Sequence, residues 1–343
     1  MSLGNTAYLP FPGQVFAHKI NFISTALAEY DIDLNNLFKG TSIDVAKLNH
    51  CAYKIHKDQI IKFYQNILAL NNPHISLWIG AAIRLQDYGL YGCTLLSCRD
   101  LRQSVAFAIR YHQLVTRTVN MSLHDDASGE LSFRFEDLLQ DKSVSRFNIE
   151  LQCVIILSLV RQCLNDQSFT FKALRLSTQR DDNHKLLKQF VGCHISYGQP
   201  FNEFLFNDQQ WQLKTAQSNP IAMPLLLNQC DSLLSVVSKK NEFLNTINGW
   251  IKDNIHSDLC TEKLADELCL TPRTLRRKLS EQGTSFTNMV KDFRCMSTKK
   301  LLVETDLTIE EVAASVGFND VSNFRAAFKK WTGHTPTSIR QAR

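Results

Sequence analysis

Along the last hundred residues, apolar side chains recur every three or four positions, a spacing that predicts short amphipathic helices. One set shares a single helical face: Ile309, Val312, Ala313 and Val316. Thr308 precedes this set and Glu311 lies three positions after Thr308, which is the pattern of a capping box at a helix N-terminus. Gly317 follows, where a helix commonly ends with positive φ, a conformation without steric cost for glycine. We therefore predict a helix from Thr308 that turns sharply at Gly317.

A second helix is predicted to begin near Asn319 or Asp320 and to bury Phe324 and Phe328, which lie four positions apart. The small side chain of Ala313 lets the two helices cross closely, at the steep angle of a helix-turn-helix motif. The exposed face of the second helix carries Ser322, Asn323, Arg325 and Lys329. Such a set of polar and basic side chains suits a DNA groove.

Residues 260–283 repeat the pattern, with Ala265 in the place of Ala313 and Cys269 in the place of Gly317. Apolar contacts come from Leu264, Leu268 and Leu270, and the second helix of this motif is predicted to have Thr271 as its N-cap, to begin at Pro272 and to bury Leu275 and Leu279. Its outer surface carries Arg273, Thr274, Arg276, Arg277 and Lys278. Arginine can bond O6 and N7 of guanine together, so this helix favours guanine-containing half-sites, although some of these groups contact phosphate instead.

Between the two motifs, residues 285–304 have helical apolar spacing and no proline or glycine, which predicts one continuous helix. This helix would fix the relative placement of the two recognition helices. Both could then enter successive major grooves, roughly 34 Å apart, and a shorter spacing would require bent DNA.

The first two thirds of the chain mix helix and strand patterns, which predicts an α+β sensor-like domain. Helices are expected over Val15–Tyr30, Ile60–Leu70, Leu101–Ala108 and Phe147–Leu164. Strands are expected over 115–123, 131–135, Phe169–Leu176 and Phe204–Phe206, and the first two flank a turn at Asp125 to Gly129 in the manner of a hairpin.

We predict three parts: an effector or dimerisation domain over residues 1–206, a linker over 207–240, and a double helix-turn-helix domain, all α-helical, over 241–343. The linker holds a polar stretch up to Pro220 and an amphipathic helix from Met223 to Val237 with Leu226, Cys230, Leu233 and Leu234 on its apolar face. That helix would either dimerise or dock.

Composition adds limits. The net charge of +5 is too small for wholesale polyanion binding, but basic groups cluster at Arg273 to Lys278 and recur at Lys291, Arg294, Lys299 and Lys300, where a duplex could lie. The alternative is that these basic side chains only form a solvated helix face. No apolar run approaches the roughly 20 residues that span a bilayer, and residues 1–14 lack a secretion signal, so we expect a cytoplasmic protein without membrane contact.

The sequence offers few candidate catalytic, metal-binding or redox residues. The ten cysteines form no C-x-x-C pair and are expected to be buried thiols, with a redox role for Cys93 and Cys98 as the minority interpretation. Metal-ligand spacings, hydrolase motifs and phosphate-binding loops are missing, and the nearest cluster is His50, Cys51 and His56. We therefore expect no metal, no cofactor and no enzymatic activity, and a catalytic N-terminal domain is the rival hypothesis.

Two further features stay open. The 21 phenylalanines either line a ligand cavity or fill an ordinary core, and ordinary packing is favoured. The segment Tyr88 to Gly92, with two glycines, is interpreted as a structural turn or a close approach of the backbone.

From residue 241 onward the chain resembles the DNA-binding domain of AraC-type (AraC/XylS) transcriptional regulators. The resemblance is carried by Ile309, Ala313, Gly317, Phe318, Phe324, Phe328, Lys329, Gly333, Pro336 and Arg340, and by Leu275 with Arg277 in the first motif. It implies base contacts from Arg273, Arg276 and Arg277, and from Val321, Ser322 and Arg325. This sequence departs from the family at Ala326, where the family usually has arginine, at Ile339 in place of tyrosine, and at Cys260 in place of a capping residue. The second motif would therefore read sequence weakly, with Arg325 as a possible substitute for the missing arginine.

Residues 77–115 resemble the N-terminal domain of the ornithine-utilisation type of AraC regulator, called arabinose-binding by analogy. That name describes a lineage, and no ligand-binding residue can be transferred from it.

The expected function is that of a sequence-specific regulator, an activator, which binds double-stranded promoter DNA and RNA polymerase and answers to an unknown small-molecule effector or a partner at its N-terminal domain. It could form a homodimer. Two alternatives remain: constitutive DNA binding with an N-terminal domain that only dimerises or contacts polymerase, and a catalytic N-terminal domain.

Overall fold

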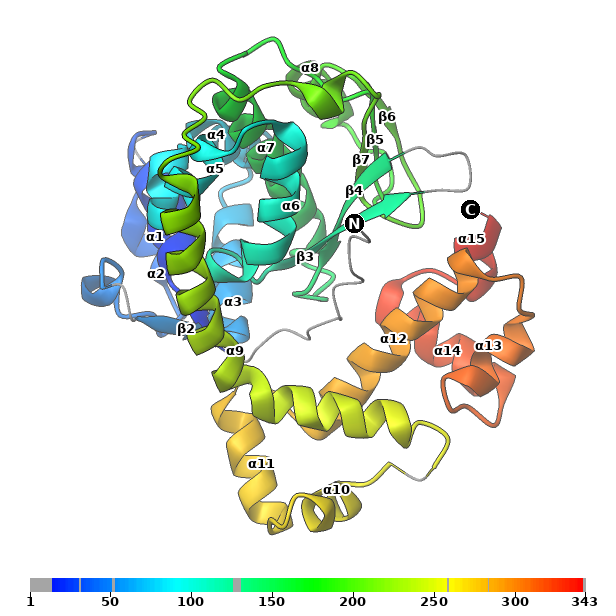
Figure 1. Ribbon diagram of the computed structural model, residues 1–343. Coiled ribbons are helices and arrows are strands. Elements are labelled where there is room, and N and C mark those ends of the chain that lie inside the picture. The colour runs from blue at the N-terminus through cyan, green and yellow to red at the C-terminus, as the bar shows by residue number, and fades with distance from the viewer. Residues whose placement is uncertain are drawn as a thin grey trace. The chain divides into compact units, whose positions relative to one another are not determined.

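The computed structural model describes residues 14–30, 32–50, 53–125, 131–257, 259–282 and 284–341. The chain forms two compact units. The N-terminal unit consists mainly of Val15–Tyr197 and Phe201–Ser238, and the C-terminal unit mainly of Lys239–Arg343. The N-terminal unit is α+β and the C-terminal unit is helical, as predicted (Figure 1).

A five-stranded sheet forms the centre of the N-terminal unit. Its strands are β3 (Val119–Asp125), β4 (Leu131–Asp137), β7 (Glu203–Leu205), β5 (Ala173–Arg175) and β6 (His194–Ser196), in that spatial order. The predicted hairpin is confirmed, because β3 and β4 pair antiparallel with Met121 opposite Phe135. Only β5 and β6 run parallel. Of the turn predicted between β3 and β4, residues 126–130 lie outside the described residues.

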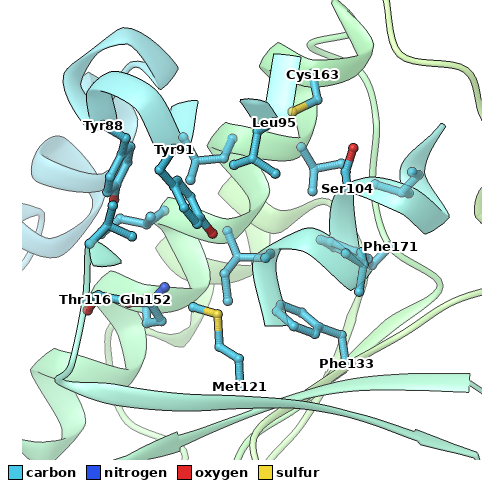
Figure 2. Close-up of a pocket in the computed structure, with 18 of the residues that line it drawn as sticks. Tyr88, Tyr91, Leu95, Ser104, Thr116, Met121, Phe133, Gln152, Cys163 and Phe171 are labelled. Atoms are coloured by element: carbon cyan, nitrogen blue, oxygen red, sulfur yellow. The ribbon is translucent and has the colours of Figure 1, made fainter. Parts of the chain in front are cut away.

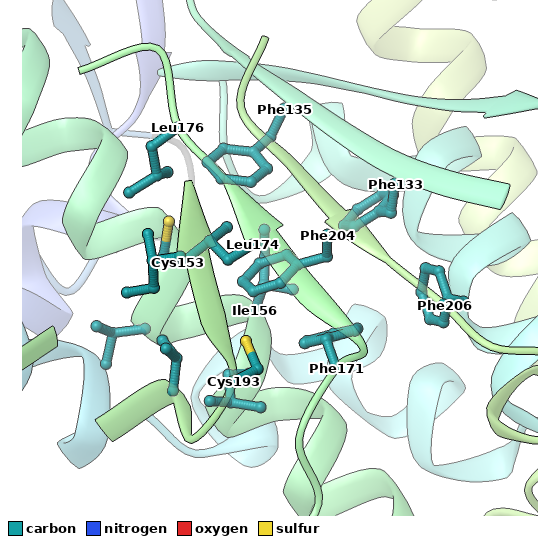
Figure 3. Close-up of a cluster of buried hydrophobic side chains, with 14 of the residues drawn as sticks. Phe133, Phe135, Cys153, Ile156, Phe171, Leu174, Leu176, Cys193, Phe204 and Phe206 are labelled. Carbon is teal, nitrogen blue, oxygen red and sulfur yellow. The ribbon is translucent and has the colours of Figure 1, made fainter. Parts of the chain in front are cut away.

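The core lies between this sheet and helix α7 (Ser145–Leu164), which confirms the long buried helix. The prediction of a strand over Phe169–Leu176 was too long. Only Ala173–Arg175 pairs in the sheet, while Phe169 and Phe171 turn into the core. Phe171 stacks on Phe204 with 4.1 Å between ring centroids, inside the cluster that Figure 3 shows. Aromatic burial therefore takes these two residues out of the strand.

Besides α7, eight α-helices begin among the described residues of this unit. They are α1 (His18–Ala28), α2 (Leu34–Phe38), α3 (Lys57–Leu68), α4 (Ile75–Ala82), α5 (Gly89–Ser97), α6 (Leu101–Tyr111), α8 (His184–Val191) and α9 (Met223–Asp253), and strands β1 (Gln14–Phe16) and β2 (Lys54–His56) form a small second sheet. The helices predicted within Val15–Tyr30, Ile60–Leu70 and Leu101–Ala108 are confirmed as α1, α3 and α6.

The segment Tyr88 to Gly92 is mostly helical, which corrects the prediction of a turn. Gly89 has φ 51° and joins a short 3-10 helix to α5, so only this glycine makes the turn. Gly92 lies inside α5, where a Cβ atom would come within 1.7 Å of the Leu85 carbonyl oxygen. The second glycine is thus explained by a close backbone approach.

The stretch after Phe206 belongs to the compact N-terminal unit. Trp211 is buried against Phe206, with 4.7 Å between ring centroids, and Cys230 of α9 is buried as well. The sequence places a helix over Met223 to Val237, and in the structure α9 continues to Asp253. The side chain of Val237 lies outside the described part.

Among the described helices, α7 is the one long and apolar enough to cross a membrane by length and composition, and 67% of its apolar window is buried inside the protein. Such burial is typical of a core helix. The cysteines that the structure describes are all free thiols; Cys98, Cys153, Cys163, Cys193, Cys230 and Cys295 are buried. Burial raises the pKa of the Cys98 thiol to about 11, which lowers its reactivity.

A lysine is buried in the N-terminal unit. Lys19 of α1 donates from Nζ to Thr118 Oγ1 at 2.8 Å and to Gln152 Oε1 at 3.5 Å. Loss of solvation lowers the pKa of Lys19 to about 7, and the charge of Asp137 acts in the opposite direction. The folded protein therefore disfavours the charged amine.

This burial predicts a pH-dependent stability. Between about pH 7 and pH 10.5 the unfolded chain keeps the Lys19 proton and the folded protein releases it, so the free energy of unfolding should rise with pH in that window. Lys19→Met should flatten this rise, in addition to any loss of stability at all pH values from the missing hydrogen bonds to Thr118 and Gln152. Urea unfolding of both proteins at pH 7 and pH 9 measures the difference. An equal rise in both would show that Lys19 is not its source.

The C-terminal unit contains α10 (Thr261–Glu267), α11 (Pro272–Glu281), α12 (Phe286–Glu304), α13 (Ile309–Ser315), α14 (Val321–Thr332) and α15 (Pro336–Gln341). One apolar cluster joins the end of α9 to α10, α11 and the start of α12, and a second joins the end of α12 to α13, α14 and α15. The predicted continuous helix between the motifs is confirmed as α12 (Figure 1).

Candidate DNA interface

The turns of the two motifs have the same geometry. Gly317 has φ 75° and Cys269, at the matching place, has φ 52°. In each turn the next backbone N–H reaches back five residues, from Phe318 to the Ala313 carbonyl at 3.0 Å and from Leu270 to the Ala265 carbonyl at 2.8 Å. This is the Schellman pattern that ends a helix in a left-handed residue. Both motifs thus make the turn that the sequence predicted.

The recognition helices α11 and α14 begin with the expected caps. The Thr271 side chain accepts from the Thr274 N–H, and the Asp320 side chain accepts from the Asn323 N–H at 2.6 Å. Thr308 and Glu311 form the predicted capping box at the start of α13. Before the turn, matching positions of the two motifs lie 48 residues apart, as Ala265 and Ala313 do. The turn of the second motif has one extra residue, so matching positions in the recognition helices lie 49 residues apart. Arg276 therefore corresponds to Arg325, and Arg277 to Ala326.

Each recognition helix is held by two side chains on its inner face. Leu275 and Leu279 fix α11, and Phe324 and Phe328 fix α14; all four are essentially fully buried. Opposite them, seven of the predicted contact residues are exposed: Arg273, Arg276, Arg277, Ser322, Asn323, Arg325 and Lys329. The structure therefore presents polar, mostly basic faces on both recognition helices.

The other three predicted contact residues are half-buried. The Thr274 hydroxyl lies 2.8 Å from that of Thr271, within the cap. The Lys278 ammonium lies 5.3 Å from the ring centre of Phe243, on the side of α9. Val321 packs at the edge of the second apolar cluster. To contact DNA, Lys278 would have to leave the Phe243 ring.

The sequence pattern places Arg294 with the basic groups where a duplex could lie, and the structure corrects this. Its Nη2 donates to the Gly317 carbonyl oxygen at 3.1 Å and its guanidinium lies 4.8 Å from the centre of the Phe318 ring. Burial lowers its pKa. Arg294 thus supports the second turn from α12.

An ion pair that sequence reasoning missed recurs in both motifs. Arg276 pairs with Glu262 at 3.0 Å and Arg325 pairs with Glu310 at 3.3 Å. Each glutamate is the second residue of the first helix of its motif, and the 48-residue repeat could have revealed this match. Exposed pairs of this kind contribute at most about 1 kcal/mol, so DNA can displace the carboxylates at little cost.

In the described part of the chain, no three His, Cys, Asp or Glu side chains group as metal ligands. Two helix-turn-helix motifs with exposed polar faces, joined by one helix, define a DNA-binding protein.

Comparison with known proteins agrees with this class. The family described as "Arabinose-binding domain of AraC transcription regulator, N-term" matches residues 32–215, more than half of the chain, and a helix-turn-helix domain family matches residues 264–342. The chain belongs to the AraC family of transcription regulators.

Three proteins similar to this chain are the following. The ornithine utilization regulator of Pseudomonas aeruginosa is 26% identical over 322 residues, which cover 92% of this chain and 93% of that one. The transcriptional activator RhaS of Citrobacter koseri is 29% identical over 120 residues, 35% of this chain and 43% of that one. The crystal structure of the regulator CdpR from Pseudomonas aeruginosa covers 98% of this chain and 100% of its own, with 20% identity and a TM-score of 0.46.

Proposed function

We propose that this protein is a transcriptional activator that binds double-stranded promoter DNA through both motifs and is controlled by a small molecule or a partner at its N-terminal unit. The observation that carries the proposal is the repeated motif, which has the same turn, a side-chain N-cap on the recognition helix and an exposed basic face in each copy. The relative RhaS is described as a transcriptional activator, which supports activation over repression. The protein would act in the cytoplasm and contact RNA polymerase.

In this proposal Arg273, Arg276 and Arg277 contact bases from α11. On α14, Ser322, Asn323 and Arg325 contact bases, while Lys329 contacts phosphate. The remaining contacts in this proposal come from Thr274, Lys278 and Val321. The first motif would supply most of the sequence discrimination, because Ala326 stands in α14 where α11 has Arg277.

Helix α9 is the proposed route of control. Within the N-terminal unit, Asp231 of α9 accepts from Arg110 Nη2 at 2.9 Å and from the Tyr111 hydroxyl at 2.7 Å. Further along the same helix, Leu244, Ile247 and Ile251 belong to the core of the first motif. A ligand would act through its different affinity for two states of this helix. Three apolar side chains are exposed at or just before the start of α9: Ile221, Leu225 and Leu233. Their exposure is consistent with a homodimer interface.

Transcription with purified RNA polymerase tests the activator role. A promoter bound by the full-length protein should give more transcript when the protein is added, and a variant with Arg276→Ala and Arg277→Ala should give none of this increase. A decrease in transcript, or no change at a bound promoter, would contradict activation.

The unequal motifs predict a gain of DNA affinity. Ala326→Arg restores in α14 the side chain that Arg277 provides in α11, at an exposed position. The variant should bind nonspecific duplexes more tightly, and the salt dependence of binding should steepen by about one unit for one added phosphate contact. Fluorescence anisotropy titrations at several salt concentrations measure this slope, with Ala326→Gln as the uncharged control. Equal slopes for the arginine and glutamine variants would place position 326 away from DNA.

A further inference from the structure

The N-terminal unit contains a cavity of about 60 Å³ beside the inner face of β3 and β4. Its walls are formed mainly by α5, α6, α7 and these two strands, and Figure 2 shows the side chains that converge on it. Every lining residue is uncharged, and most are aliphatic or aromatic. Because burying a charge without a partner is very unfavourable, this lining selects against charged occupants.

Two buried polar groups of the lining have unused hydrogen-bonding capacity. Tyr91 of α5 is 5% exposed and its hydroxyl points toward the middle of the cavity. Among the described residues none is recorded as a hydrogen-bond partner of this hydroxyl. Gln152 of α7 is 2% exposed; its Oε1 accepts from Lys19, which leaves the amide NH₂ without a recorded partner in the described part. Buried groups of this kind usually have a partner, which a ligand or water would supply.

The remaining hydroxyls of the cavity are less available. Ser104 Oγ donates to the Asp100 carbonyl at 3.1 Å, and Thr116 Oγ1 lies 3.3 Å from Thr118 Oγ1. Burial raises the pKa of Tyr91 well above its ordinary value, so its hydroxyl keeps its proton and can donate. Tyr88 adds one more hydroxyl to the lining. The cavity therefore offers two buried donors, from Tyr91 and Gln152, and one half-buried hydroxyl, from Tyr88, within an apolar surface.

We infer that this cavity binds a small uncharged molecule with an apolar body and one carbonyl or hydroxyl oxygen, which accepts hydrogen bonds from Tyr91 and Gln152. The cavity is larger than the space of about 10–15 Å³ that one water needs, so it can admit a small organic molecule. A sugar would leave several hydroxyls without partners, and a dibasic amino acid would bury unpaired charges. This ligand class thus differs from the arabinose and ornithine named for the relatives.

The same wall contacts α9. Tyr91, Leu95 and Cys163 line the cavity and also belong to the apolar cluster that holds Met223 and Cys230 of α9. Thr94 Oγ1, one turn from Tyr91, lies 3.6 Å from Cys230 Sγ. A ligand that displaces α5 would therefore also displace the side chains against which α9 packs. This role of the cavity rests on the proposed function, whereas the binding site does not.

Ligand binding is tested directly on the full-length protein without DNA. Calorimetry or NMR titration with cyclopentanone, which has six heavy atoms, is compared with cyclopentane, L-arabinose and L-ornithine. Cyclopentanone should bind saturably, and Tyr91→Phe should weaken it about fivefold to tenfold, the effect of one lost hydrogen bond. Tyr53→Phe, which removes a hydroxyl outside the cavity, should leave the affinity for cyclopentanone unchanged. Cyclopentane should bind Tyr91→Phe and the unchanged protein equally.

Absence of saturable cyclopentanone binding, or equal affinity in Tyr91→Phe, would overturn the site. Saturable binding of arabinose or ornithine that depends on Tyr91 would overturn the ligand class. DNA titrations of the same samples keep the two proposals apart. Specific DNA binding without cyclopentanone binding would overturn the ligand site but not the proposed regulator function. Cyclopentanone binding without specific DNA binding would overturn the proposed function but not the ligand site.

Discussion

Gly317→Ala is expected to lower the free energy of unfolding of the C-terminal unit by about 2–5 kcal/mol and to abolish DNA binding. An added Cβ atom would lie 1.9 Å from the Ile255 carbonyl oxygen and 3.3 Å from Arg294 Nη2. The positive φ of 75° costs a residue with a side chain about 1–2 kcal/mol, and overpacking costs about 1–3 kcal/mol more. Urea unfolding followed by tryptophan fluorescence, together with a DNA titration, measures both effects.

Cys269 is the matched control, because it holds the same backbone conformation with a side chain already present. Cys269→Gly removes the left-handed strain but adds freedom to the unfolded chain, so stability should rise by at most about 1 kcal/mol. Cys269→Ala should change it little. Should Gly317→Ala prove as harmless as Cys269→Ala, the close approach of Ile255 would not constrain the second turn.

Arg277→Ala is expected to cost about 1–3 kcal/mol of specific DNA binding, concentrated at one base pair, if its guanidinium bonds a guanine. Arg277 is exposed and pairs only with Glu281 of its own helix among the ion pairs of the described residues, so DNA can engage it readily. The measurement compares affinities for the preferred site and for sites with each base pair changed.

Uniform weakening over all sites would instead assign Arg277 to phosphate. Lys278→Ala provides the contrast, because loss of a phosphate contact should reduce the salt dependence by about one unit without changing base preference. An unchanged slope would mean that Lys278 stays on the Phe243 ring when DNA binds.

The sequence predicted the C-terminal unit well because its signals are local. Thr308 with Glu311, the glycine at 317, and Thr271 followed by Pro272 each fix a helix end through a contact within a few residues. The exposed arginines follow from the same helical periodicity. Their partners Glu262 and Glu310 lie on another helix, so periodicity within one helix could not reveal them.

The N-terminal unit was harder to predict because its signals depend on distant contacts. Helices α4 and α5 are largely apolar around their circumference, so no helical face stands out, and β5, β6 and β7 have only three residues each. The direction of the Tyr91 hydroxyl depends on how α5 lies over α7 and the sheet. For the same reason, no sequence pattern separated a phenylalanine beside the cavity, such as Phe133, from one in the closed core, such as Phe135.

Selection of bound genomic fragments by the full-length protein at physiological salt tests most directly whether the two motifs of one chain read specific DNA. We expect enrichment of discrete promoter fragments, and loss of that enrichment in a variant with Arg276→Ala and Arg277→Ala. Enrichment of fragments without a common sequence, or equal enrichment by the variant, would contradict sequence reading by these helices.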